Sequence, residues 1–204
     1  MQSFKDKLRE CEDCRKFGRH YEEILKFAQK ASIHFNAYKI CQNRNIRNLF
    51  IAEAPPWEEP KYFYNTEIEA GALRKGLFDQ LKIKDYTKCG LKTFNEECFL
   101  TDTIKCRLKK THPNPPSEVI ANCAKRFLLH DIESLKPKNI VVLGNTAKKG
   151  LEQFSEFEAL RKFRVKKDCG RKIRVKDYTV VLYVFPNDMN SNVMKGHPLI
   201  ELLK

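Results

Sequence analysis

The chain has 204 residues, of which 42% are hydrophobic and 11% aromatic. This length and composition argue against a disordered polypeptide and predict one folded domain spanning residues 1–204. Lysine and arginine number 39 against 26 aspartate and glutamate residues, a formal net charge of +13. Such an excess favours a polyanionic partner because neutralising phosphates releases counterions, although a generally Lys-rich proteome would also explain it.

No apolar run approaches the ~20 residues that span a bilayer, and the first residues lack the apolar segment of a signal peptide. We therefore expect a soluble, intracellular, cytoplasmic protein with no membrane partner, acting as a monomer. The chain contains eight cysteines. In a reducing compartment these favour metal or cluster ligation over a disulfide framework.

Short apolar runs alternate with amphipathic segments along the chain. This alternation predicts an α/β fold in which helices cover both faces of a parallel sheet. The first helical segment is expected over residues 1–31, followed by a loop at 32–46. Strands are expected at 48–52, 98–104, 139–144 and 178–184, with helices at 70–81, 117–135, from about 145 and at the C-terminus, and a basic hairpin-like region at 161–177.

A proline-rich loop at 111–116 precedes the helix at 117–135. Ser117 has the character of an N-cap, and Glu118 would lie in the first turn, where the helix dipole favours a negative charge. Lys136 and Pro137 end this helix, because proline cannot continue the hydrogen-bond ladder.

The cysteines show one CxxC pair, Cys11 and Cys14, and two later residues 17 positions apart, Cys106 and Cys123. Four thiolates suit either a tetrahedral zinc ion or a [4Fe–4S] cluster. The missing second CxxC pair favours the cluster, since zinc sites of this type usually have two. Burial as small hydrophobic residues is the alternative, and it is the one we expect for the remaining candidates, Cys41, Cys89, Cys98 and Cys169.

Three segments together resemble the iron–sulfur uracil-DNA glycosylases of family 4. Residues 51–59 are similar to that family's strand and GEAPG-like loop. Residues 101–107 and 117–123 resemble its T-N-x-x-K-C-R…P…E-x-x-x-x-C segment. Residues 136–147 are similar to its L-x-P-x-x-I-V-x-L-G-x-x-A segment. With the CxxC pair, the resemblance covers most of residues 11–150.

The resemblance implies a three-layer α/β/α fold with a central four-stranded, mostly parallel sheet and an active site at the carboxyl ends of its strands. It implies a prokaryotic, nucleoid-associated enzyme of base-excision repair that flips a damaged base out of single- or double-stranded DNA and hydrolyses its N-glycosidic bond. It also implies a structural [4Fe–4S] cluster, whose ligands would be Cys11, Cys14, Cys106 and Cys123.

Three acidic residues match or replace catalytic positions of the family. Glu53 matches the residue that activates water or stabilises the sugar cation, and Glu59 matches a second acid. Asp102 replaces the base-reading asparagine. An ionised aspartate only accepts hydrogen bonds, so Asp102 would read uracil poorly unless protonated, and could suit a base that presents N–H donors. Hypoxanthine and xanthine are therefore competing substrates.

The substrate pocket departs further from the family. Thr66 occupies the stacking position when residues are counted without gaps, with the aromatic residues 62–64 just upstream. Phe185 stands where the family has a histidine that stabilises the departing base, and Asn187 follows it. The substrate-binding candidates are therefore Ala54, Tyr64, Thr66, Phe185 and Asn187.

Basic residues cluster beside the third cysteine, and we expect them to contact DNA phosphates or to be a solvated loop. They are Lys105, Arg107, Lys109 and Lys110. A second phosphate-binding strip is expected over residues 161–176.

The leading hypothesis is a DNA glycosylase that removes a deaminated base, uracil by default. The second is a glycosylase-like module that binds nucleic acid without cleaving it. The third is a zinc-dependent protein with a basic surface.

Overall fold

The computed structural model describes Cys11 and residues 45–56, 62–106 and 115–204. Apart from Cys11, the predicted helix over 1–31 lies outside the described residues, as does nearly all of the predicted loop at 32–46.

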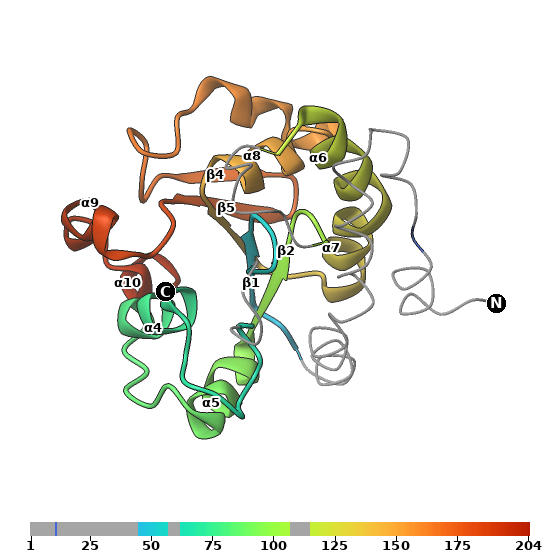
Figure 1. The fold of residues 1–204 in the computed structure, drawn as a ribbon. Helices are drawn as coiled ribbons and strands as arrows, with labels where there is room; N and C mark the ends of the chain where they lie inside the picture. The colour runs from blue at the N-terminus through green and yellow to red at the C-terminus, as the bar shows by residue number, and fades with distance from the viewer. Residues whose placement is uncertain (1–10, 12–44, 57–61, 107–114) are drawn as a thin grey trace.

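A five-stranded sheet forms the centre of the fold, in the order β2-β1-β3-β5-β4 (Figure 1). Four strands run parallel, and β4 pairs antiparallel with β5 at one edge. Their bounds are β1 Asn48–Ala52, β2 Cys98–Asp102, β3 Asn139–Leu143, β4 Lys172–Val175 and β5 Tyr178–Tyr183. The predicted α/β class is confirmed, with five strands where four were expected.

The extra strand lies in the segment predicted to be a basic hairpin. In β4, Lys172 and Arg174 are exposed, whereas Val175 is buried. An edge strand with charged outward-facing residues has little apolar character, and such charges protect the edge from pairing with other chains.

Alternate residues of the central strands face opposite sides of the sheet, as strand geometry requires. On one side, Phe50, Leu100 and Val141 belong to a core that includes residues of α4, α5 and α10. On the other side, Ile51 and Ile140 belong to a core that includes residues from α7 and α8. The sheet is thus covered on both faces, as expected for fully buried parallel strands (Figure 1).

The helices mostly follow the predicted positions, with bounds α4 Ala72–Leu81, α5 Lys88–Glu97, α6 Ser117–Cys123, α7 Leu129–Leu135, α8 Asn145–Leu151, α9 Ser191–Lys195 and α10 Leu199–Leu202. A π-helical turn, η3 (Ala124–Leu128), joins α6 to α7, and the 3-10 turns η4 (Ser155–Lys162) and η5 (Asp188–Asn190) complete the described elements. Among the described helices, none combines the length and hydrophobicity needed to cross a membrane.

Two details of the helices differ from the predictions. Helix α5 was not expected, because Leu91 and Phe94 are its only large buried apolar residues; Thr87 caps its first turn by accepting a hydrogen bond from the Cys89 N–H. Ser117 is the first helical residue and not the N-cap, since extended Pro116 occupies that position. Glu118 does lie in the first turn, as predicted.

Candidate active site at the carboxyl ends of the strands

Glu53 follows β1 directly and is half-buried at the carboxyl edge of the sheet. One of its carboxylate oxygens, Oε2, accepts a hydrogen bond from the Thr146 hydroxyl at 2.5 Å. Thr146 lies in the first turn of α8, immediately after β3. The side chain of Glu53 is therefore oriented by a neighbouring strand–helix junction, which suits a carboxylate that must hold water or face a developing positive charge.

Asp102 ends β2 and pairs with Ala52, the last residue of β1, so it lies beside Glu53 in the same edge of the sheet. The residue is only 5% exposed. Burial raises the pKa of Asp102 to about 7; the negative charges of Asp131 and Glu53 add to this, and the positive charge of Lys105 opposes it. Near neutral pH, a large share of the molecules therefore carries a protonated Asp102, which can both donate and accept a hydrogen bond.

Lys105 turns its ammonium group into the protein. Its Nζ donates to the Thr101 hydroxyl at 2.6 Å, to the Asp102 main-chain oxygen at 2.8 Å and to Asp131 Oδ2 at 2.6 Å. The side chains of Lys105 and Asp131 are 9% and 1% exposed. All three ammonium hydrogens thus have internal acceptors, and the phosphate contact of Lys105 stays a prediction.

The turn between β2 and the proline-rich loop is attached to the end of β1. The Thr103 N–H donates to the Ala52 carbonyl and the Ile104 N–H to the Glu53 carbonyl, both at 2.9 Å. The Thr103 hydroxyl also bonds the Ala52 carbonyl, at 2.9 Å. The backbone that leads from Asp102 towards Cys106 is thereby fixed against the backbone that carries Glu53.

Three of the four predicted cluster ligands are described, and all three are buried, namely Cys11, Cys106 and Cys123. The Lys105 main-chain N–H donates to Cys123 Sγ at 3.2 Å, so the turn that ends in Cys106 contacts the helix that ends in Cys123. Hydrogen bonds from peptide N–H groups to sulfur are among the interactions that tune iron–sulfur sites. Cys14 lies outside the described residues, and within the described part of the chain no three metal-ligating side chains gather.

The remaining cysteines divide by exposure. Cys98 is buried beside the Asn48 amide, which lies 3.7 Å from its sulfur, and burial raises the pKa of its thiol to about 12. Burial also raises the pKa of Cys169. Both behave as the small buried residues that were predicted. Cys89 is exposed on α5, so the prediction was wrong there, and Cys41 lies outside the described residues.

Tyr64 covers the outer edge of β2. Its hydroxyl donates to the Leu100 carbonyl at 3.0 Å and accepts from the Leu100 N–H at 2.7 Å. Its ring stacks on Phe99 with 5.8 Å between centroids. The hydroxyl thus bonds backbone groups that another strand would otherwise pair. Stacking of Tyr64 on a substrate base stays a prediction. Thr66 is exposed, and Ala54 is half-buried next to Glu53.

The loop after β5 is held by side-chain amides. Asn190 Nδ2 donates to the Phe185 carbonyl at 2.9 Å and to Asn187 Oδ1 at 3.0 Å, and the Asn190 N–H donates to the same Oδ1 at 3.2 Å. Phe185 and Asn187 are half-buried. Between them and Asn190 lies Met189, which is 89% exposed and was not singled out from the sequence. The sequence feature that could have identified Met189 is its position as an apolar residue within the polar run Asn187–Asn192.

The other predicted contacts divide into two groups. Glu59, Arg107, Lys109 and Lys110 lie outside the described residues. In the basic strip at 161–176, several exposed cations are engaged in ion pairs, with Arg161 bonded to Glu158, Arg171 to Asp168 and Lys176 to Glu156.

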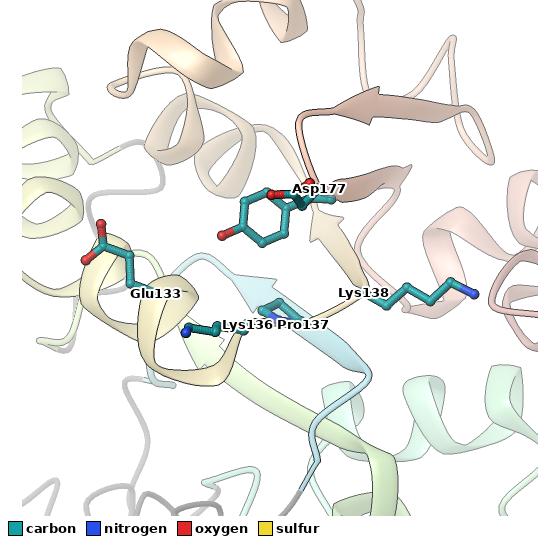
Figure 2. A pocket seen from close by; sticks show the side chains of 6 residues that line it. Glu133, Lys136, Pro137, Lys138 and Asp177 are labelled. Atoms are coloured by element: carbon teal, nitrogen blue, oxygen red, sulfur yellow. The ribbon is translucent and has the colours of Figure 1, made fainter.

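A separate depression of about 520 Å³ lies at the opposite end of the sheet. Figure 2 shows its lining, which comes from the end of α7, the segment before β3 and the turn between β4 and β5. Its residues are Glu133, Lys136, Pro137, Lys138, Asp177 and Tyr178. None of the predicted site residues lines it, so it is unrelated to the carboxyl-edge site.

Comparison with known proteins identifies the family of this chain. The family model described as the Uracil DNA glycosylase superfamily matches residues 38–198. The chain belongs to the uracil-DNA glycosylase superfamily. It is 26% identical over 181 residues to the Type-4 uracil-DNA glycosylase of Archaeoglobus fulgidus. The aligned region covers 86% of this chain and 79% of that protein. The predicted resemblance to family 4 is confirmed, and membership of the superfamily supports a glycosylase-type function with DNA as the partner.

Proposed function

We propose that this protein is a DNA glycosylase that hydrolyses the N-glycosidic bond of a deaminated base flipped out of DNA, with uracil as the default substrate. The observation that carries the proposal is the placement of Glu53, oriented by Thr146, beside the buried Asp102 at the carboxyl edge of the sheet. Ligands of open α/β sheets bind at this edge. In this proposal, residues 1–204 form one domain that acts as a monomer in base-excision repair.

Glu53 is the carboxylate that would hold the attacking water or face the sugar as it gains positive charge. Its hydrogen bond to Thr146 restricts the rotation of the carboxylate, so little reorganisation is needed when a substrate binds. Ala54 follows Glu53 in the same loop and would line the sugar side of the pocket.

Asp102 is the residue that would read the edge of the flipped base. In its protonated form the hydroxyl can donate to uracil O4 while the carbonyl accepts from uracil N3–H, which is the pattern an asparagine amide offers. The raised pKa of Asp102, caused first by burial, maintains that form up to neutral pH. The ionised form would repel uracil O4 and suit a base with an extra N–H donor.

Met189 is the apolar side chain best placed to enter the DNA stack. It extends from the amide-braced loop after β5 and is 89% exposed. Apolar side chains inserted between bases help to unstack and kink DNA, and base flipping requires such unstacking. Phe185 and Asn187, at the base of this loop, would then lie beside the flipped nucleotide.

We further propose a [4Fe–4S] cluster on Cys11, Cys14, Cys106 and Cys123. The three described thiols are buried, and a peptide N–H already bonds one of them, which fits thiolate ligands of a cluster. When bound, the group would act structurally by linking the N-terminal segment to the turn between β2 and α6.

Base excision provides the test of the proposed activity. Purified protein is incubated with oligonucleotides that contain uracil, hypoxanthine or xanthine, and abasic sites are then cleaved with alkali. We expect strand breaks with uracil, and a loss of about 10²- to 10⁴-fold in rate for Glu53→Gln, because one positioned general base contributes about that much. The exposed Glu201→Gln on α10 is the matched control and should retain the wild-type rate.

The altered pocket makes a binding module the second candidate, since Asp102 and Phe185 replace the two residues that the family uses on the base. Tight DNA binding with no abasic sites on any of the three substrates would overturn the enzymatic proposal in favour of this module.

A further inference from the structure

Lys105 contacts two parts of the molecule that carry different candidate functions. Its ammonium group lies at the end of β2, whereas its main-chain N–H bonds a cysteine of α6. We propose that Lys105 and Asp131 form a positioning pair that couples the cysteine site to the Asp102 end of β2.

The Lys105 ammonium group has a full set of internal hydrogen-bond acceptors. Its three acceptors come from the last two residues of β2, through the Thr101 hydroxyl and the Asp102 carbonyl, and from Asp131. Asp131 Oδ2 also accepts from the Thr101 hydroxyl at 2.7 Å. Thr101, Lys105 and Asp131 thus form a closed triangle of hydrogen bonds, and a buried charge pair is held best when such additional bonds accompany it.

The main chain of Lys105 contacts the cysteine site. The Lys105 N–H lies 3.2 Å from Cys123 Sγ, and the next residue in sequence is Cys106. Any movement of the turn at 103–106 would therefore change both the thiol environment and the position of the Lys105 ammonium.

A π-helical turn separates Cys123 from Asp131. These residues are eight positions apart. In a regular α-helix of 3.6 residues per turn, that separation would rotate the two side chains about 80° away from each other. A π turn absorbs one residue, so the effective spacing becomes about seven, within about 20° of two whole turns. Turn η3 therefore lets both side chains contact the same residue, Lys105.

Lys105 is thus a positioning residue and not a DNA ligand. The pair itself rests on the distances above, and its effect on catalysis rests on the proposed glycosylase function. The two roles of Lys105 predict different salt dependences, because each phosphate contact contributes about one unit to the slope of log affinity against log salt.

The first experiment measures binding of a uracil-containing oligonucleotide across a salt series for wild type, Lys105→Met and Lys92→Met. Lys92 is exposed on α5 and provides the charge-matched control. We expect the slope of Lys105→Met to equal that of Lys92→Met, while the single-turnover excision rate falls at least tenfold in Lys105→Met alone. A slope reduced by about one in Lys105→Met alone would show a phosphate contact and overturn the positioning role.

The second experiment follows the cysteine site without measuring activity. The rate at which an iron chelator bleaches the visible absorbance is compared for wild type, Lys105→Met, Asp131→Asn and the double variant. We expect the absorbance to bleach several-fold faster in each single variant than in wild type. The double variant should bleach no faster than the faster of the two single variants. Asp131→Asn preserves volume and one acceptor, so it keeps the test valid if Lys105→Met does not fold.

A bleaching rate of Asp131→Asn equal to that of wild type would overturn the coupling. Increases in bleaching rate that add in the double variant would overturn it as well. A wild-type protein that binds DNA but excises no base would overturn the proposed function alone, because the salt slope and the bleaching rates would still decide the role of the pair.

Discussion

Two ion pairs at different places in the fold show how burial changes the role of a basic residue. Lys105 and Asp131 are 9% and 1% exposed and share their hydrogen bonds with Thr101 and the end of β2. Arg161 and Glu158, near the β4 edge of the sheet, are 61% and 66% exposed. Lys105 and Arg161 both lie in basic stretches of sequence. Of the two, only Lys105 is buried, and its ammonium group is held by hydrogen bonds to Thr101, Asp102 and Asp131.

The difference has a physical origin. Water screens an exposed pair and competes for its hydrogen bonds, so the pair contributes little to stability and its cation can exchange partners. A buried pair has given up its hydration, so the removal of one partner leaves an uncompensated charge. Exposed cations on the β4 side can therefore exchange partners, whereas Lys105 cannot leave Asp131 without leaving a buried charge uncompensated.

The largest expected effect is on the buried pair. Asp131→Ala should lower the free energy of unfolding by about 3–5 kcal/mol, because it strands the Lys105 ammonium in the interior. Urea unfolding followed by circular dichroism measures the change. A loss below about 1 kcal/mol, typical of surface pairs, would contradict the contrast between the two regions.

The pH dependence of uracil excision tests the buried carboxyl next to that pair. The folded-state pKa of Asp102 is raised to about 7, so its protonated form is lost as pH rises through 7. We expect the single-turnover rate of wild type to fall by up to about tenfold per pH unit above 7, as for any step that needs one bound proton.

Asp102→Asn is the matched variant for this profile, since its amide keeps a donor and an acceptor at every pH. Its rate on uracil should stay level between pH 6 and 8. Parallel profiles for the two proteins would show that Asp102 does not read the base.

A smaller effect is expected for the exposed loop after β5. Met189→Ala should slow excision from duplex DNA by about three- to tenfold, because the apolar contact that compensates for unstacking is lost. Excision from single-stranded DNA should change less, since no stack has to be opened. Equal losses on the two substrates would argue against insertion of Met189 into the duplex.

The smallest effect is predicted for the exposed pair. Glu158→Ala should change the free energy of unfolding by less than about 1 kcal/mol and leave excision unchanged. The same urea titration and uracil assay measure both. A loss comparable with that of Asp131→Ala would remove the distinction between the buried and exposed pairs.

Sequence patterns were sufficient for features that depend on local composition. The apolar runs at 48–52 and 139–143 predicted buried parallel strands, because such strands are covered on both faces. Sequence patterns did not predict strand β4, in which charged residues alternate along the strand. They also did not predict helix α5, which buries few large side chains.

Long-range partners explain the remaining differences at the site. Lys105 stands beside Cys106 and near Arg107 and reads as part of a basic loop, since nothing local indicates that Asp131, 26 residues later, accepts its hydrogen bond. Tyr64 bonds Leu100 across 36 residues and Glu53 bonds Thr146 across 93. Such pairings follow from the arrangement of strands, which the sequence specifies only through the complete fold.

The most direct test of the proposed glycosylase activity is identification of the released base. A uracil-containing oligonucleotide is incubated at pH 6 with excess wild-type protein, and free bases are quantified by mass spectrometry beside Glu53→Gln. We predict one free uracil per oligonucleotide with wild type and at least a hundredfold slower release with Glu53→Gln. An oligonucleotide that is bound by wild type yet retains its uracil would contradict the account.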